Sequence, residues 1–188
     1  MKKYWEKVEI GDALTPLNKK PISRLHLAQF AAASDDFSPL HLDDEYAKSV
    51  GFGSVFVPGL MALGLAEDAL KTFASNSNLV SLSGTFQRMI WPGDTLTAKG
   101  IVLRHYKSHE EHRLQLAVWV ENQNKEIVMK GQAVLTLFKN IEEETRENSP
   151  IPPISKASHD ALIEKCEKLT NLSPASIPPR NLAPRELA

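Results

Sequence analysis

Before residue 78, apolar positions recur with helical spacing in two stretches of the chain. The stretch 24–34 follows Ser23, which suits a helix N-cap. The stretch 58–74 is apolar around most of its first three turns, and Pro58 suits a first-turn position because its missing amide donor goes unused there. A helix with so little polar surface is expected to be buried on nearly all sides. Gly59 and Gly64 would let another segment or a ligand approach the helix backbone closely, and tight packing of the helix on a sheet is the favoured interpretation at Gly64.

Beyond residue 78 the apolar positions change to the period of two that is typical of β-strands. The predicted strands cover 79–91, 95–106, 114–121 and 126–139, with 13–17 as an earlier strand. Gly131 predicts a β-bulge in the last of them. Long consecutive antiparallel strands after one buried helix imply an α+β fold in which the sheet wraps around that helix.

The character of the chain changes at residue 140. Seven of its twelve prolines fall between Pro150 and Pro184, and apolar residues become sparse. We therefore expect a first domain at 1–139 and a proline-rich C-terminal extension at 140–188. One amphipathic helix is predicted in the extension, at 158–170.

Charge and composition exclude several classes of partner. The 188 residues include 22 basic and 23 acidic ones, so a nucleic-acid-binding surface is not expected. No apolar stretch is long enough to span a bilayer, and residues 1–6 lack the apolar core of a signal peptide. The single cysteine, Cys166, excludes an internal disulfide framework and fits a reducing compartment. The expectation is a soluble, cytoplasmic protein without a membrane partner.

The candidate chemistry lies in the segment 34–47. Asp36 and His41 are five positions apart, and Pro39 between them disfavours a regular helix over 37–40. An irregular loop could turn both side chains towards one point, where a carboxylate and an imidazole form a general acid–base pair. In the alternative interpretation Ser34 or Asp36 caps one helix, Pro39 starts another and His41 is an ordinary loop histidine. The spacing alone leaves both interpretations open.

Two further groups of ionisable residues have a structural and a functional interpretation. The acidic triplet 43–45 suits the start of a short helix that ends near Val50, and its alternative role is to bind a divalent metal together with His41. The three histidines His105, His109 and His112 lie among charged residues, which predicts a solvated turn. A zinc site is the alternative there, and the absence of an accompanying cysteine disfavours it.

The run Phe30-x3-Ser34-x-Asp36-Phe37-x-Pro39-Leu40-His41 with Ala47 resembles the signature of the MaoC-like, or R-specific enoyl-CoA hydratase, family, which typically reads S-G-D-x-N-P-x-H. The resemblance continues at 55–61 and 91–96 and covers roughly residues 5 to 138. Three positions depart from the family pattern. Asp35 stands in place of glycine, Ser38 in place of asparagine, and Pro58 in place of the histidine that many members carry.

This resemblance implies a hot-dog fold and a hydratase or dehydratase that acts on a 2-enoyl or (R)-3-hydroxyacyl thioester of CoA or acyl carrier protein, without cofactor or metal. It assigns Asp36 and His41 jointly to acid–base catalysis on one water. It places the amide of Gly59, at the start of the central helix, against the thioester carbonyl, and Ser38 in orienting the loop. It also implies at least a homodimer. An acyl thioesterase and a non-catalytic acyl-binding subunit of a heterodimeric dehydratase are the alternatives.

Overall fold

The computed structural model describes residues 1–149. They contain a compact unit, Met1–Asn148, which ends with the helix α5 (Ile141–Glu147). The predicted helix at 158–170 and Cys166 lie outside the described residues, and the domain boundary at 139/140 stays a prediction. In the described part of the chain, no helix is both long enough and apolar enough to cross a membrane.

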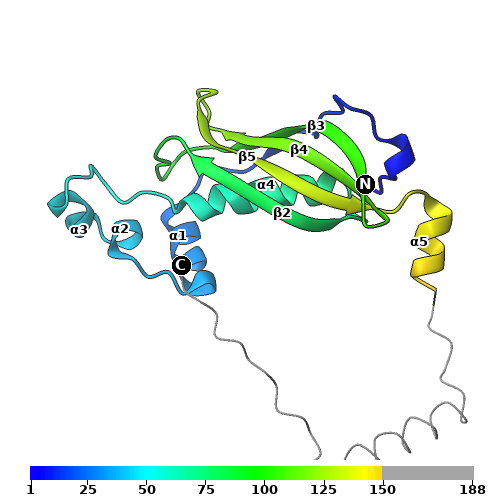
Figure 1. Ribbon diagram of the computed structural model, residues 1–188. Helices are drawn as coiled ribbons and strands as arrows, with labels where there is room; N and C mark the ends of the chain where they lie inside the picture. Colours follow the sequence, from blue (N-terminus) through cyan, green and yellow to red (C-terminus); the bar gives the residue numbers. More distant parts are fainter. Residues whose placement is uncertain (150–188) are drawn as a thin grey trace, which may run out of the picture. The chain divides into compact units, whose positions relative to one another are not determined.

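Five antiparallel strands form one curled sheet, as the alternating pattern predicts (Figure 1). The strands are β1 (Leu17–Asn18), β2 (Asn78–Phe86), β3 (Thr97–Ser108), β4 (Glu111–Glu121) and β5 (Ile127–Leu137), and their order across the sheet is β1-β3-β4-β5-β2. The strands β1 and β2 are therefore the two edges, and β4 lies at the centre. Every second residue of β4 is buried, from His112 to Val120, so one face of the sheet carries the core.

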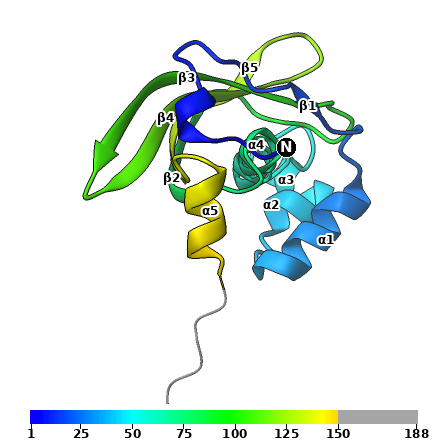
Figure 2. The same cartoon turned by 90° about the vertical axis from the view of Figure 1, so that its right-hand side faces the viewer.

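The helix α4 (Gly59–Phe73) runs across the inner face of the sheet (Figure 1). Figure 2 views this helix nearly end-on, with the sheet curled over one side and the helices α1 (Arg24–Ser34), α2 (Pro39–Leu42) and α3 (Asp44–Ser49) on the other. The predicted extent of the helix is confirmed, but the expected burial on nearly all sides is wrong. Leu60 is 55% exposed and Gly64 is also exposed, because these positions line a cavity between α1 and α4.

Local sequence signals account for the beginning of α1. The Ser23 hydroxyl accepts a hydrogen bond from the backbone N–H of His26 at 3.3 Å, and the Ser23 N–H donates to Nδ1 of His26 at 3.1 Å. This reciprocal capping box satisfies two backbone donors that the first turn of a helix otherwise leaves unpaired. The predicted N-cap is therefore confirmed.

Two glycine predictions are wrong. Gly131 pairs regularly with Gly84 of β2 and Val118 of β4, without a bulge. It is required for a different reason, since a Cβ at this position would overlap the carbonyl oxygen of Ser83 in the neighbouring strand. Gly64 does not pack tightly on the sheet, because a Cβ added there would point into open space, with no atom of another segment within 4 Å.

The predicted solvated turn is also wrong for one of its histidines. His112 is only 6% exposed, and its ring lies 4.8 Å from the ring of Trp5, which belongs to the short 3-10 helix η1 (Trp5–Lys7). In addition, Nδ1 of His112 lies 3.7 Å from a carboxylate oxygen of Glu143. The strand β4 begins at Glu111, earlier than predicted, and its alternation places His112 on the buried face.

Candidate active site

The segment that carries the predicted acid–base pair starts with a left-handed residue. Asp35 ends α1 with φ 57° and ψ 25°, a conformation that glycine adopts freely and that aspartate tolerates better than most other residues. The glycine of the family pattern therefore has a conformational role at this position. Aspartate can fulfil this role as well, so the first departure from the pattern preserves the backbone path.

The path from Asp36 to His41 is only partly irregular. The backbone N–H of Ser38 donates to a carboxylate oxygen of Asp36 at 3.3 Å, which closes a short turn over residues 36–38. A helical turn, α2, then begins at Pro39 and includes His41. The expected loop across 37–40 is therefore wrong at its second half, because proline at the first helical position costs no hydrogen bond.

A backbone carbonyl orients the imidazole of His41. Its Nδ1 lies 2.7 Å from the carbonyl oxygen of Phe56, and the Phe56 ring meets the imidazole edge-on at 4.8 Å between centroids. A carbonyl oxygen can only accept, so Nδ1 must carry the proton of this hydrogen bond. In the neutral imidazole the lone pair is then on Nε2, which is the nitrogen that can accept a proton in catalysis.

The same stretch of backbone leads directly into α4. The Phe56 N–H donates to the carbonyl of Leu40 at 3.3 Å, so α2 is bound to this stretch through both backbone and side chain. Gly59 follows three residues after Phe56 as the first residue of α4. Within residues 1–149 the Gly59 N–H has no hydrogen-bond partner, as expected for a helix N-terminus. The ring of Phe86 packs on the glycine so closely that a Cβ would lie 2.9 Å from it.

The predicted site residues thus make two separate sets of contacts. Asp36 binds the backbone of Ser38, and His41 binds the stretch that ends at Gly59. Among the described residues, no hydrogen bond or ion pair joins Asp36 to His41.

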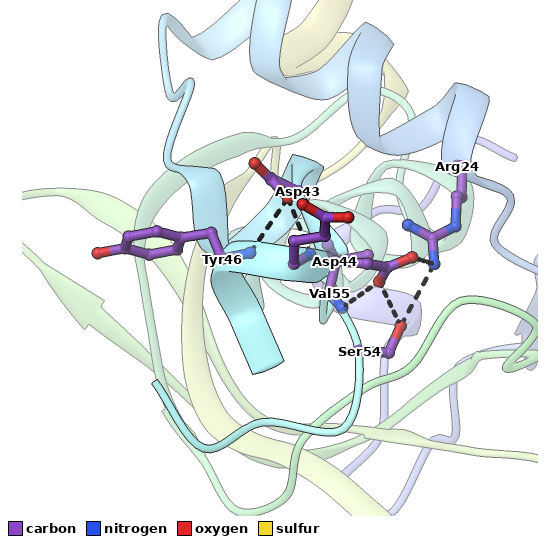
Figure 3. Close-up of polar contacts among 7 residues, drawn as sticks. Arg24, Asp43, Asp44, Tyr46, Ser54 and Val55 are labelled. Atoms are coloured by element: carbon purple, nitrogen blue, oxygen red, sulfur yellow. Dashed lines mark hydrogen bonds and ion pairs between the residues drawn. The ribbon is translucent and has the colours of Figure 1, made fainter. Parts of the chain in front are cut away.

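The acidic triplet lies at the start of the short helix α3, as its structural interpretation predicts, and two of its members also bind backbone N–H groups (Figure 3). Asp43 caps α3 by accepting from the N–H groups of Glu45 and Tyr46 at 2.9 and 3.1 Å. The carboxylate of Asp44 instead accepts from the N–H of Val55 at 2.9 Å, the hydroxyl of Ser54 at 3.0 Å and the guanidinium of Arg24 at 2.6 Å. No group of three potential metal ligands lies together within residues 1–149.

These contacts stabilise the ionised form of the Asp44 carboxylate and so lower its pKa. The Val55 N–H, and after it the Arg24 guanidinium, lower the pKa of Asp44 to about 2. The carboxylate is therefore ionised throughout the neutral range. Sequence reasoning missed this cluster because its members come from three separate segments, and the only local signal was an acidic residue in the first turn of a helix.

A cavity of about 670 Å³ lies between α1 and α4. Its apolar wall consists of Ile22, Phe30, Leu60, Met61, Leu65 and Leu96, and charged residues of α4 and the stretch 19–20 line it as well. Asp36, His41 and Gly59 are not among the lining residues. Leu60 is, however, the residue directly after Gly59, so the cavity begins beside the first turn of α4.

A curled antiparallel sheet over a central helix, with an Asp-x4-His segment bound just ahead of that helix, defines the class of hot-dog hydratases. A family model described as "MaoC like domain" matches residues 6–132, and the chain belongs to this family. The predicted fold class and the family resemblance are thereby confirmed.

Named relatives agree with this assignment. The chain is 30% identical over 141 residues to the 3-hydroxybutyryl-CoA dehydratase of Methylorubrum extorquens, a match that covers 74% of this chain and 87% of that protein. It is 32% identical over 82 residues to the (R)-specific enoyl-CoA hydratase of Aeromonas caviae, covering 43% of this chain and 61% of the relative. The solved structure of the (R)-hydratase from A. caviae superposes with a TM-score of 0.63 at 27% identity, over 70% of this chain and 98% of that one.

Proposed function

We propose that this protein is a lyase that adds water to a 2-enoyl thioester, or removes it from the (R)-3-hydroxyacyl thioester, with Asp36 and His41 as the acid–base pair. The observation that carries the proposal is the contact between His41 Nδ1 and the Phe56 carbonyl at 2.7 Å. It leaves Nε2 as the proton acceptor, on a residue bound just ahead of the first turn of α4. Membership of a family whose named relatives are hydratases and dehydratases supports the same reaction.

The chemistry needs three functions from the site. One water loses a proton as its oxygen bonds to the β-carbon of the enoyl group, and a proton is delivered to the α-carbon. Asp36 and His41 share these transfers through the water that they hold. Negative charge that develops on the thioester oxygen is stabilised by the N–H of Gly59 at the helix N-terminus, which no other group in residues 1–149 binds. Ser38 supports the turn that presents Asp36, through its N–H.

The cavity beside α4 supports an acyl thioester as the substrate. A thioester carbonyl at Gly59 would direct its acyl chain towards Leu60 and the apolar wall that begins there. The volume of about 670 Å³ lies within the range of small-molecule sites. CoA and acyl carrier protein are both candidate carriers, because either presents the same thioester to the site.

A homodimer is the expected assembly. The strand β2 forms an open edge of the sheet, and its residues are exposed along nearly the whole strand. Val80 and Phe86 on this strand are 46% and 48% exposed, so the edge strand carries exposed apolar side chains that a partner could cover. Pairing of β2 with the same strand of a second copy would cover it. Sedimentation equilibrium tests this directly, and a monomeric mass at micromolar concentration contradicts it.

The decisive experiment is hydration of crotonyl-CoA, followed by loss of the enoyl absorbance, with a free-thiol reagent in a parallel sample. Loss of absorbance without free thiol supports the hydratase. Release of thiol instead identifies a thioesterase. If neither signal changes for crotonyl-CoA and for a longer 2-enoyl-CoA, the proposal is rejected in favour of a non-catalytic acyl-binding subunit.

A further inference from the structure

We propose that Asp44 is a positioning residue for His41, which acts by holding the backbone stretch 54–56 against α2. This inference rests on the proposed function, since it concerns the residue that is assigned there as an acid–base group. It goes beyond that function because Asp44 does not belong to the acid–base pair or to the carbonyl-binding amide.

Two side chains share one stretch of backbone as their binding partner. His41 binds the carbonyl of Phe56, and Asp44 binds the N–H of the preceding residue, Val55, at 2.9 Å. Leu40 adds a backbone contact, because its carbonyl accepts from the N–H of Phe56. The segment 40–44 is therefore bound to residues 54–56 at its beginning, through Leu40 and His41, and at its end, through Asp44.

Arg24 connects a third segment, the start of α1, to Asp44 and to Ser54. Arg24 is the first residue of α1, and its guanidinium binds Asp44 at 2.6 Å and the Ser54 hydroxyl at 3.3 Å (Figure 3). Both oxygens of Asp44 are thus occupied, one by Arg24 and the other by Ser54 and Val55. Three hydrogen bonds on one carboxylate fix its position far better than a single contact would.

The stretch that Asp44 binds is itself held in place by its buried residues. Val55 is fully buried and Val57 is 2% exposed, while the Val57 N–H donates to the carbonyl of Ile90 at 2.8 Å. This stretch is therefore anchored in the core and cannot shift without disturbing it. Because Asp44 binds α3 to this anchored stretch, the neighbouring α2 and the His41 imidazole keep a defined distance from the start of α4.

The adjacent acidic residue provides a matched comparison. Asp43 caps α3 through backbone N–H groups of its own helix only, at Glu45 and Tyr46. Asparagine caps helices about as well as aspartate, so Asp43→Asn should leave the site unchanged. Asp44→Asn keeps one acceptor oxygen but removes the charge that Arg24 binds, and Asp44→Ala removes all three contacts.

The test combines kinetics with a direct view of the imidazole. In the full chain, Asp44→Ala and Arg24→Ala should lower kcat by about 100-fold and about 10-fold, with KM nearly unchanged, because misplacement of a reacting group by about 1 Å can cost about 100-fold. Arg24→Lys should recover most of the loss. Asp43→Asn and Arg113→Ala, which removes another arginine–carboxylate pair at Glu111, should retain wild-type kcat.

The second measurement is the 15N spectrum of the histidine side chains, with His41 assigned by comparison with His41→Gln. In the wild type we expect a proton on Nδ1, and in Asp44→Ala a mixture of both tautomers. Wild-type kcat in both Asp44→Ala and Arg24→Ala would overturn the inference, as would a loss of kcat with the wild-type His41 spectrum. If Asp44→Ala fails to fold, Arg24→Ala decides on its own.

The two proposals can fail separately. If the wild type hydrates no enoyl thioester, the proposed function fails, and the His41 spectrum still decides whether Asp44 positions the imidazole. A changed spectrum in Asp44→Ala then supports the positioning role, and an unchanged one rejects it.

Discussion

Replacement of Gly59 by alanine tests the proposed carbonyl-binding site most sharply. The new Cβ would lie 2.9 Å from three atoms of the Phe86 ring, whereas ordinary contact begins at 3.4 Å. The ring must therefore move by about 0.5 Å or more. It can do so, because Phe86 is 48% exposed, and the fold should survive. We therefore expect the substitution to lower kcat without unfolding the protein.

The expected magnitude follows from the position of the substituted residue. A methyl group at the first residue of α4 narrows the approach of a thioester carbonyl to the Gly59 N–H. A donor of this kind contributes about 3 kcal/mol to the transition state, and partial loss of alignment should lower kcat about 100-fold. Crotonyl-CoA hydration measures this loss, and circular dichroism with thermal unfolding verifies the fold.

A double substitution distinguishes the two causes of such a loss. In Gly59→Ala with Phe86→Ala the clash is absent, so recovered activity would assign the defect to displacement of the ring. Persistent loss would assign it to the new methyl group at the amide. If Gly59→Ala alone keeps kcat within about threefold of the wild type, the assignment of Gly59 to the carbonyl is refuted.

The other predictions concern the acid–base pair, the sheet and the low-pH behaviour. Asp36→Asn and His41→Ala should each lower hydration by at least about 100-fold without unfolding the protein, and full activity in either variant rejects the pair. Gly131→Ala should lower the free energy of unfolding by about 3 kcal/mol in urea titrations, because its Cβ would overlap backbone of β2. Gly53→Ala, with no atom within 4 Å of the new Cβ, is its control. The pKa of Asp44 is lowered to about 2 from 3.8 in the folded chain, so its contribution to stability is present above about pH 4 and is lost as the pH falls towards 2. The difference in urea midpoint between the wild type and Asp44→Asn should therefore be larger at pH 6 than near pH 2, and an equal difference at both contradicts the ionic role.

Periodicity suffices for the elements that bury a regular face. The extent of α4, the Ser23 cap of α1 and the alternation of β4 are local properties of the chain, and each is predicted by neighbouring residues. Positions where a second segment determines the outcome are predicted wrongly. At Gly131 the strand pattern indicates a bulge. The pairing with β2 shows a different reason for the glycine, because a side chain there would overlap the backbone of Ser83.

The candidate site divides in the same way. The order and spacing of Asp36, His41 and Gly59 are properties of the sequence, and they are sufficient to indicate the family and its chemistry. Only the tertiary structure decided which imidazole nitrogen is free, because that depends on the carbonyl of Phe56, fifteen residues away. It also decided that Asp44 binds Arg24 and Val55, since long-range hydrogen bonds arise from how segments pack and leave no periodic trace in the chain.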